Sequence, residues 1–472
     1  MSYATLFVAG ERNGAGTEGF RGTVNGMIRR QFLALAGSWA SSAALARVGA
    51  LPASTPQVTD PADITLRINE TTWELAPRRT IRTRAYNGQV PGPLLRARLG
   101  TPLTVDVVND SRDEEIVHWH GFHIPSDVDG AFEEGTPRVA PHGRRRYVFT
   151  PQPAGTRWYH THGMADRNLK RSTYTGQFGM FLVDGGSDAG AYDQEVPILL
   201  HEWEPHFTDQ GSLDVDFRYF SINGKMLGAG EPIRVKRAER VLFRIVNASA
   251  TLSHRLSLPG HQFLVTALDG NAVPKPARVP VVDVAPGERV DAVVDMDRPG
   301  VWVLGEVRRD WRTAGMGIVV EYAGAQGVPR WDPPASFAWD YGAFGGTQAV
   351  PEPDERLALV FRATGDGHHW TINGKSYPRA DPIVVHANTR YRWLLDNQSA
   401  EHHPIHLHRH TFEVVRVAGQ PVSGILKDVV VVPAWKQVEV DVHAIHPGPS
   451  LFHCHQQLHM DMGFMAMMQY AD

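Results

Sequence analysis

The sequence has 472 residues, of which 47 are lysine or arginine and 51 are aspartate or glutamate, so its formal net charge is −4. This balance gives no electrostatic reason to expect a nucleic acid or an acidic membrane surface as the partner. Hydrophobic residues make up 42% and charged residues 21%, which is ordinary for a globular protein and excludes wholesale disorder.

The first 54 residues are predicted to be an N-terminal extension with an export signal. Arg29 and Arg30 precede a weakly apolar stretch without charge that runs from residue 31 to residue 46. Paired arginines before such a stretch resemble a twin-arginine export signal. The stretch is too short and too interrupted for a membrane span. We therefore expect the twin-arginine export machinery as a partner and a periplasmic or secreted location; a helix of the mature fold is the alternative.

From residue 55 onward, short apolar stretches alternate with turn residues, and the chain contains 45 glycines and 33 prolines. This pattern predicts an all-β fold of the sandwich type. No long stretch has apolar residues at helical spacing, so we expect no long helices. Examples of predicted strands are 103–108, 146–149, 241–246, 413–417 and 437–442.

A coarse internal repeat predicts three similar units. The phrase Val-Ala-Pro at 139–141 recurs at 284–286 and, as Val-Val-Pro, at 431–433, and an asparagine ends a predicted strand at 109, 247 and 397. The repeat length of roughly 140–150 residues agrees with the length of a typical domain. We predict domains at 55–186, 187–325 and 355–472, with a linker rich in glycine and proline at 326–354.

Histidines are concentrated around the only cysteine of the chain. Ten of the 23 histidines and Cys454 lie in four short pieces, which are H-W-H-G at 118–121, H-T-H-G at 160–163, H-P-I-H-L-H at 403–408 and H-C-H-Q-Q-L-H at 453–459. Residues i and i+2 of a strand point to the same face, so each H-x-H presents two imidazoles in one direction. Two such pairs from each of two domains are suited to surround a multi-metal cluster.

The fourth piece separates two kinds of site. His453 and His455 should face one way, whereas Cys454 between them should face a different metal. A cysteine with two histidines, here Cys454, His459 and His403, is the trigonal ligand set of a blue copper site. The eight other histidines suit a cluster of three coppers.

These four pieces resemble the motifs of the multicopper oxidase family, which includes laccases, bilirubin oxidases and cuprous oxidases. The resemblance extends over residues 60–472 and implies three cupredoxin-like Greek-key β-sandwich domains, with four copper ions bound by the first and third. It implies a type 1 copper held by His403, Cys454 and His459. It implies a type 2 copper held by His118 and His406, and two type 3 coppers held by His120, His160 and His455 and by His162, His408 and His453.

The family's axial position over the type 1 copper, ten residues after the cysteine, is occupied here by Phe464. Phenylalanine cannot coordinate a metal, so we expect a three-coordinate site with a high reduction potential. A shift of one residue that brings Met465 over the copper is the alternative.

Two carboxylates are candidates for proton chemistry. Asp129 matches the family's acidic residue beside the three-copper cluster, with an ordinary turn aspartate before Gly130 as the alternative. A second acid that many bacterial relatives carry directly after the last histidine is replaced by Met460. Glu401, two residues before His403, is a candidate to accept a proton from a phenol, or a solvated loop carboxylate.

The resemblance implies that a small-molecule reductant gives electrons to the type 1 copper. They would pass through Cys454, His453 and His455 to the three-copper cluster, where dioxygen is reduced to water. We predict a laccase-like oxidase of phenols or aromatic amines, with a cuprous or ferrous ion oxidase as the alternative. A copper nitrite reductase would not need all four pieces, and a copper-free structural relative would have lost ligands. The loops around His403 and His459 are expected to select the reductant.

Overall fold

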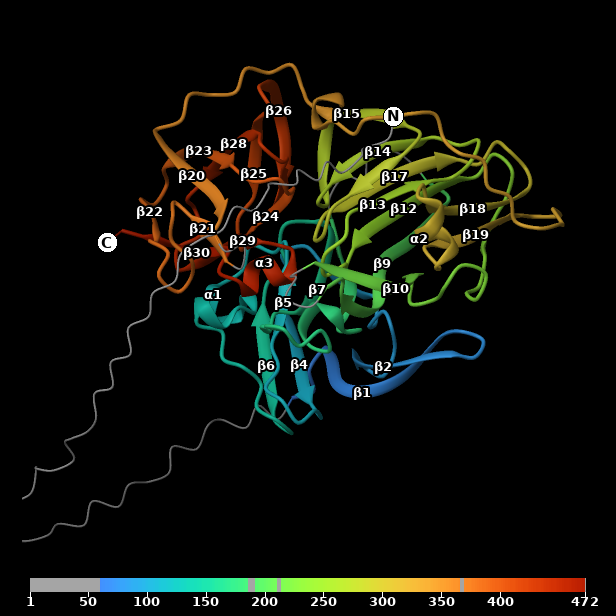
Figure 1. Ribbon diagram of the computed structural model, residues 1–472, viewed down its shortest axis with the longest axis horizontal. Coiled ribbons are helices and arrows are strands. Elements are labelled where there is room, and N and C mark those ends of the chain that lie inside the picture. Colours follow the sequence, from blue (N-terminus) through green and yellow to red (C-terminus); the bar gives the residue numbers. More distant parts are fainter. Residues whose placement is uncertain (1–59, 186–191, 210–213, 366–368, 472) are drawn as a thin grey trace, which may run out of the picture. The chain divides into compact units, whose positions relative to one another are not determined.

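The structure is a computed structural model that describes residues 60–185, 192–209, 214–365 and 369–471. The predicted export signal at 1–54 lies outside these residues. In the described part of the chain, no helix has both the length and the apolar character needed to cross a membrane. Figure 1 shows that the described chain is built mainly of strands. Its α-helices have at most five residues, as the sequence predicted.

The first β-sandwich is formed by two four-stranded sheets with the strand orders β2-β1-β4-β6 and β3-β8-β7-β5. Its strands are β1 (Ile64–Ala76), β2 (Arg79–Tyr86), β3 (Leu95–Arg98), β4 (Leu103–Asn109), β5 (Val117–His120), β6 (Arg144–Phe149), β7 (Gly155–Thr161) and β8 (Phe178–Asp184). Short helices lie between them at α1 (Ser126–Asp129), η1 (Phe132–Glu134) and η2 (Ser172–Tyr174).

The second β-sandwich has sheets of six and five strands, with the orders β10-β9-β12-β17-β14-β15 and β11-β19-β18-β13-β16. Its strands are β9 (Gln194–Phe207), β10 (Val215–Ile222), β11 (Ile233–Val235), β12 (Arg240–Asn247), β13 (His254–Ser257), β14 (Phe263–Leu268), β15 (Asn271–Val279), β16 (Val282–Val284), β17 (Arg289–Asp295), β18 (Val301–Glu306) and β19 (Gly317–Tyr322). The helix α2 (Arg309–Thr313) precedes β19, and η3 (Tyr341–Phe344) lies in the connection to the third sandwich.

The third β-sandwich repeats the second strand for strand, with the orders β21-β20-β23-β28-β25-β26 and β22-β30-β29-β24-β27. Its strands are β20 (Glu355–Ala363), β21 (Trp370–Ile372), β22 (Ile383–Val385), β23 (Arg390–Asn397), β24 (His403–Leu407), β25 (Phe412–Val417), β26 (Gln420–Lys427), β27 (Val429–Val432), β28 (Gln437–His443), β29 (Ser450–Cys454) and β30 (Met465–Tyr470), with α3 (Gln457–Asp461) before the last. The first sandwich has the same order with fewer strands. The prediction of an all-β chain of three similar sandwiches is therefore confirmed.

The repeated asparagines explain why the three units resemble one another in sequence. Each is buried at the end of a strand, accepts the N–H of a serine two residues later, and donates its amide to a carbonyl of a neighbouring strand or turn. The acceptor bonds come from Ser111, Ser249 and Ser399 (2.9, 2.9 and 3.0 Å), and the donor bonds go from Asn109 to Val139, Asn247 to Val284 and Asn397 to Val432 (3.0, 2.8 and 3.1 Å). Buried polar groups need such partners, so the residue type recurs.

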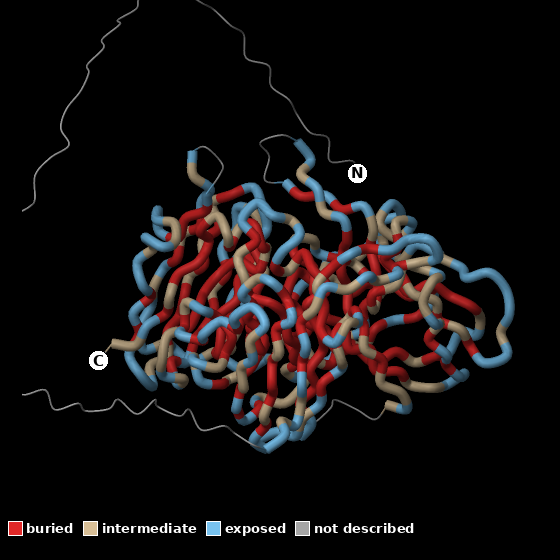
Figure 2. Tube along the Cα trace, turned by 90° about the horizontal axis from the view of Figure 1, so that it is seen from below, coloured by how far each residue is buried: buried red, intermediate tan, exposed pale blue. Residues whose placement is uncertain are grey.

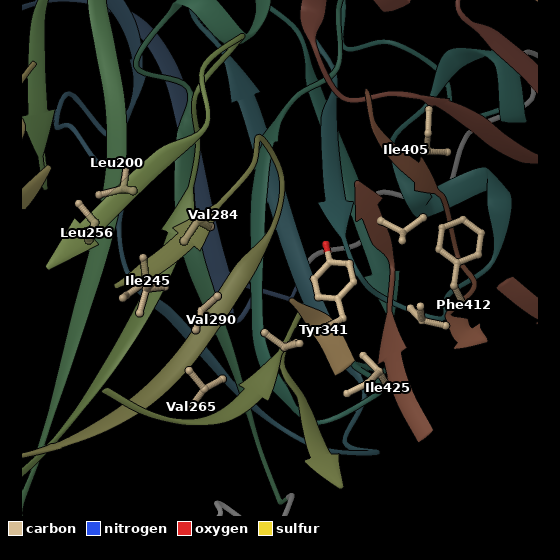
Figure 3. Packing of buried hydrophobic residues seen from close by; sticks show 14 of the residues in the cluster. Leu200, Ile245, Leu256, Val265, Val284, Val290, Tyr341, Ile405, Phe412 and Ile425 are labelled. Carbon is tan, nitrogen blue, oxygen red and sulfur yellow. The ribbon is translucent and has the colours of Figure 1, made fainter. Parts of the chain in front are cut away.

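The core of the described chain is continuous between the second and third sandwiches. Figure 2 shows buried segments running through the molecule. Tyr341 of the connection lies between core residues of the two sandwiches, such as Val290 and Ile425 (Figure 3). Its hydroxyl donates to Glu288 Oε1 at 2.5 Å. The segment 326–354 thus contributes to the core as well as connecting two units, and we propose the domain limits given above.

The second sandwich carries an ion cluster where the third carries His403 and Cys454. His254 lies opposite Val284 as His403 lies opposite Val432, and Glu306 takes the ladder position of Cys454. His254 Nε2 is 2.7 Å from Glu202 Oε1, and its Nδ1 is 3.3 Å from Glu306 Oε2. All three side chains are buried. An ion cluster therefore replaces the candidate metal ligands at the equivalent place.

This cluster should make stability depend on pH. Burial alone would lower the pKa of His254, but hydrogen bonds with Glu202 and Glu306 outweigh it and raise the pKa from 6.5 to about 9. The contribution of His254 to the free energy of unfolding is complete below about pH 6.5 and is lost as the pH rises through about 9. This loss is about 3 kcal/mol at most. Urea unfolding should show the difference in unfolding free energy between wild type and His254→Gln shrinking over this range. The exposed His443→Gln variant is the control, and a constant difference would contradict the assignment.

Candidate metal centre

Four buried strands bring the predicted ligands together. In the first sandwich His118 of β5 lies opposite His160 of β7, and in the third His406 of β24 lies opposite His453 of β29. His162, His408 and His455 follow directly after these strands, and His459 lies on α3. Every predicted ligand is buried except His459, whose side chain is 12% exposed.

Eight histidines form one cluster between the first and third sandwiches. His120 Nδ1 is 3.3 Å from His160 Nε2, and His408 Nε2 is 3.0 Å from His453 Nε2. One nitrogen from each of His162, His408 and His453 lies within 4.8 Å of the others, and the same holds for His118, His406 and His408. The ring centroids of His120 and His455 are 5.1 Å apart. The structure therefore brings all eight predicted cluster histidines together.

The hydrogen bonds of these rings leave nitrogens free toward the interior of the cluster. Nδ1 of His118, His160 and His406 donates to the carbonyls of Asp129, Thr161 and Asp428 at 3.0, 2.8 and 2.7 Å. Nε2 of His118, His162, His406 and His455 is buried without a hydrogen-bond partner in the described structure.

Such unpaired buried nitrogens are costly unless something binds them. Burial lowers the pKa of all eight histidines, so their rings are neutral. Neutral imidazole is the form that binds transition metals. The donor set therefore fits metal ions at this place.

A second donor set surrounds the thiol on the opposite face of β29. His403 Nδ1 and His459 Nδ1 lie 3.9 and 3.6 Å from Cys454 Sγ. The outer nitrogens are held by Ser399 Oγ at 2.8 Å and by Glu401 Oε2 at 3.1 Å. Two imidazoles and one thiolate match the trigonal set of a blue copper site.

Phe464 borders this second set. Its buried ring lies 4.9 Å from that of His403 and 5.5 Å from that of Trp370. Met465 packs instead in a separate cluster with Ala131, Leu451 and Met460. This arrangement favours Phe464 over Met465 at the axial position.

Two buried carboxylic acids contact His408 of the eight-histidine cluster. Asp129 Oδ2 lies 2.9 Å from His408 Nδ1 and 3.1 Å from His118 Nδ1. Glu134 Oε1 lies 3.2 Å from His408 Nδ1 and accepts the N–H of Leu451 at 2.5 Å. Burial raises the pKa of Asp129 to about 7, and burial with the charge of Asp129 raises that of Glu134 well above its usual range. Two acids so close together share a proton near neutral pH.

Neither Glu134 nor Asp428 was predicted from the sequence. Glu134 follows Asp129 by five residues in the piece D-G-A-F-E-E, which is typical of a solvated turn. Asp428 follows a lysine before β27, and its Oδ1 lies 3.0 Å from His120 Nε2. The signal that would have found Glu134 is a second acid close to the first; the sequence holds no comparable signal for Asp428.

Three family models described as multicopper oxidase match this chain at residues 67–188, 194–313 and 351–472. The multicopper oxidase MmcO of Mycobacterium tuberculosis is 29% identical over 436 residues, covering 83% of both chains. The bilirubin oxidase of Albifimbria verrucaria is 28% identical over 422 residues, covering 81% of this chain and 71% of its own. All three matched segments lie within the three sandwiches and their connections.

Solved structures agree with the fold. A multicopper oxidase from Pseudomonas thermotolerans superposes with a TM-score of 0.68 at 25% identity, covering 87% of this chain and 100% of its own. Fet3p, described as a multicopper oxidase that functions in iron import, superposes with a TM-score of 0.74 at 17% identity, covering 86% and 90%. Each sandwich is therefore cupredoxin-like.

Proposed function

This chain belongs to the multicopper oxidase family, whose members are copper-dependent oxidoreductases that use dioxygen, and from that premise we propose that it is a laccase-like oxidase of phenols or aromatic amines. The observation that carries the proposal is the position of Cys454 on β29. Its sulfur faces His403 and His459, while the neighbouring His453 and His455 contribute to the eight-histidine cluster. One strand thereby joins two donor sets through a few covalent bonds.

We assign four coppers to these donors. His403, Cys454 and His459 would hold type 1 copper, and His118 and His406, whose Nε2 atoms are both unpaired, would hold type 2 copper. The two type 3 coppers would be held by His120, His160 and His455 and by His162, His408 and His453. The short distances from His120 to His160 and from His408 to His453 support this division.

When bound, the coppers would supply one-electron oxidation of the substrate and four-electron reduction of dioxygen to water. The chain's own side chains prepare this chemistry. Asp129 and Glu134 hold a proton beside His408 and are placed to deliver it to the cluster. Phe464 withholds an axial ligand, so we expect a high type 1 potential.

His459 and Glu401 form the exposed side of the type 1 donor set, where a substrate would give up its electron. The Glu401 side chain is 50% exposed, and its hydrogen bond with His459 lowers the pKa of its carboxyl. An ionised carboxylate here is suited to accept a proton from a phenol as the electron leaves. The same exposed carboxylate would attract a cation, which keeps a cuprous or ferrous ion oxidase as the alternative function.

Oxygen uptake by the copper-loaded protein tests the proposal. The expected result is fast uptake with a diphenol, without release of peroxide, and little uptake with cuprous or ferrous ions. Fast uptake with the metal ions alone would establish the alternative. Uptake with neither substrate, in a protein that holds its copper, would reject both functions.

Glu401→Gln should slow phenol oxidation selectively. Loss of the proton acceptor is expected to lower kcat/KM for a diphenol at least ~10-fold, since positioned bases typically contribute about 10²–10⁴-fold and water replaces part of this. Oxidation of ferrocyanide, which releases no proton, should change less than about twofold if the role is proton acceptance. Glu352→Gln, which removes an exposed carboxylate paired with Arg356, is the control. Equal losses with both donors would instead assign Glu401 to the electronic properties of His459.

We also propose that the protein is exported to the periplasm or secreted by the twin-arginine route. The support is the Arg29-Arg30 pair followed by an apolar stretch. Replacing both arginines with lysine should leave the protein in the cytoplasm, which cell fractionation would detect.

A further inference from the structure

None of the predicted copper ligands comes from the second sandwich, yet its Arg289 is linked through Asp428 to the predicted ligand His120. Arg289 is the first residue of β17 and is fully buried. Its Nη1 and Nη2 donate to the two carboxylate oxygens of Asp428 in the third sandwich, at 2.5 Å each. Asp428 Oδ1 in turn lies 3.0 Å from Nε2 of His120 in the first sandwich. One chain of contacts thus joins all three sandwiches.

His120 differs from its neighbours in the nitrogen that faces the cluster. His118, His160 and His406 each donate Nδ1–H to a backbone carbonyl, which leaves Nε2 for a metal. His120 instead offers Nε2–H to Asp428, which leaves the lone pair of Nδ1 directed at His160 Nε2, 3.3 Å away. An imidazole has only one such lone pair, so the partner of one nitrogen decides which nitrogen can bind a metal.

Asp428 can perform this role only as a charged acceptor. Burying a carboxylate without a nearby cation costs free energy, so a buried carboxylic acid tends to keep its proton. Two buried cations are near: Arg157 Nη1 lies 3.6 Å from Asp428 Oδ2, and Arg289 makes the shorter, two-point contact that also fixes the plane of the carboxylate. Asp269 of the second sandwich holds the backbone of Asp428, because its Oδ2 accepts the N–H groups of Asp428 and Val429 at 3.2 and 3.0 Å. The hydrogen bonds that fix the position of the Asp428 carboxylate and backbone therefore come from the second sandwich.

Two glycines show how closely this part of the second sandwich approaches the cluster. A Cβ on Gly121, the glycine of the H-W-H-G piece, would lie 2.6 Å from Arg289 Nη2 and 2.8 Å from Asp428 Oδ2. A Cβ on Gly287 would lie 2.7 Å from Cδ2 of His455. The turn at 287–289 thus touches His455 directly and His120 through Asp428, and both belong to the same proposed type 3 set.

We propose that Arg289 is a positioning residue for one type 3 copper: through Asp428 it holds His120 with Nε2 toward the carboxylate, so that Nδ1 would be the nitrogen available to bind that copper. This inference rests on the copper assignment of the proposed function. The second sandwich, which supplies no predicted ligand, would then be required for the cluster because it fixes the orientation of a ligand.

Copper binding and electron paramagnetic resonance of Arg289→Gln test this proposal. A type 3 pair is silent in that spectrum while its two coppers are coupled. Losing the outer partner of a ligand typically lowers metal affinity about 10- to 100-fold, so about one copper per molecule should be lost on dialysis against a chelator. The remaining type 3 copper should become visible in the spectrum. The blue absorption of the type 1 set should be retained.

Two further variants and a control separate positioning from folding. Arg289→Lys keeps the buried charge but not the two-point contact, so it should fold and show a partial loss of coupling. Asp428→Asn should behave as Arg289→Gln does. Arg244→Gln removes another buried arginine of the second sandwich, paired with Asp291 and Glu195, and should keep the full copper content.

Wild-type copper content and a silent pair in Arg289→Gln, or in Asp428→Asn if the former does not fold, would overturn the inference. Losses of copper in Arg244→Gln equal to those in Arg289→Gln would also overturn it, in favour of general destabilisation. If the wild-type protein itself holds no coupled copper pair, the proposed function fails. That result differs from a failure of the Arg289 proposal, in which wild type and variant both hold the pair.

Discussion

Cys454→Ser should give a colourless protein that no longer oxidises diphenols. The Cys454 sulfur is buried, with Nδ1 of His459 and His403 at 3.6 and 3.9 Å, and burial raises the pKa of the thiol in the absence of metal. A soft, deprotonated sulfur is what gives a blue copper site its affinity and its colour. A serine hydroxyl supplies neither. Turnover of diphenol should therefore fall to the level of copper-free protein, with about one copper per molecule lost.

The same variant should keep its other donor set. The neighbours His453 and His455 point to the opposite face of β29, and their rings are held among those of His162 and His160. Copper analysis and the spectrum of the coupled pair should therefore remain those of an intact cluster. Phe464→Leu, which changes the apolar neighbour but no donor, is the control and should stay blue. If Cys454→Ser retained the blue colour, Cys454 would not be a ligand. The proposed oxidase function would then fail, and a metal-binding cupredoxin-like protein would be the remaining interpretation.

The sequence was sufficient to predict which histidines lie together around Cys454 and which form the larger cluster, because their arrangement is local. Alternation along a strand places His118 and His120 on one face and separates Cys454 from His453, whatever the rest of the chain does. The three sandwiches were predictable for a related reason, since the buried asparagines at 109, 247 and 397 perform the same hydrogen bonding in each unit. Short-range geometry leaves a recognisable pattern in the sequence.

The residues around the ligands were not predictable because they meet only in the folded chain. His120 and Asp428 are 308 positions apart, and Arg289 and Asp428 are 139 apart. An aspartate after a lysine, or an arginine that begins a strand, is typical of a solvated surface, and nothing local marks either as buried. Glu134 lay close to Asp129 in sequence, but only the turn through α1 and η1 shows that both side chains face His408.

The second and third sandwiches differ at equivalent positions in their capacity to bind a metal. At the place of His403 and Cys454, the second sandwich has His254 and Glu306, and its imidazole is bonded to carboxylates through both nitrogens. No ring nitrogen of His254 is left to bind a metal. The same sandwich instead directs Arg289 toward Asp428, so its contribution to the cluster is electrostatic and positional.

Asp129→Asn should lower oxygen consumption about 10²–10⁴-fold, the usual contribution of a positioned acid or base. The asparagine has nearly the same shape, and its carbonyl can still accept one N–H from His408 or His118, both of which now contact Asp129 Oδ2. It cannot hold or transfer a proton. Glu134 would remain beside His408 but would lose the acid with which it shares a proton. Reduction of the type 1 set by diphenol near His459 should therefore proceed, whereas reaction with oxygen should be slow.

Stopped-flow absorption separates these two halves of the reaction. Under anaerobic conditions the blue colour of Asp129→Asn should bleach with diphenol at the wild-type rate, and after oxygen is admitted it should return far more slowly than in wild type. Asp127→Asn, an exposed neighbour on the same short helix α1, is the matched control and should behave as wild type does. Slow bleaching in Asp129→Asn would mean that the aspartate acts on the electron-entry side. A wild-type return of colour would leave Glu134 as the sole proton donor, because no other acid of the proposed relay contacts His408.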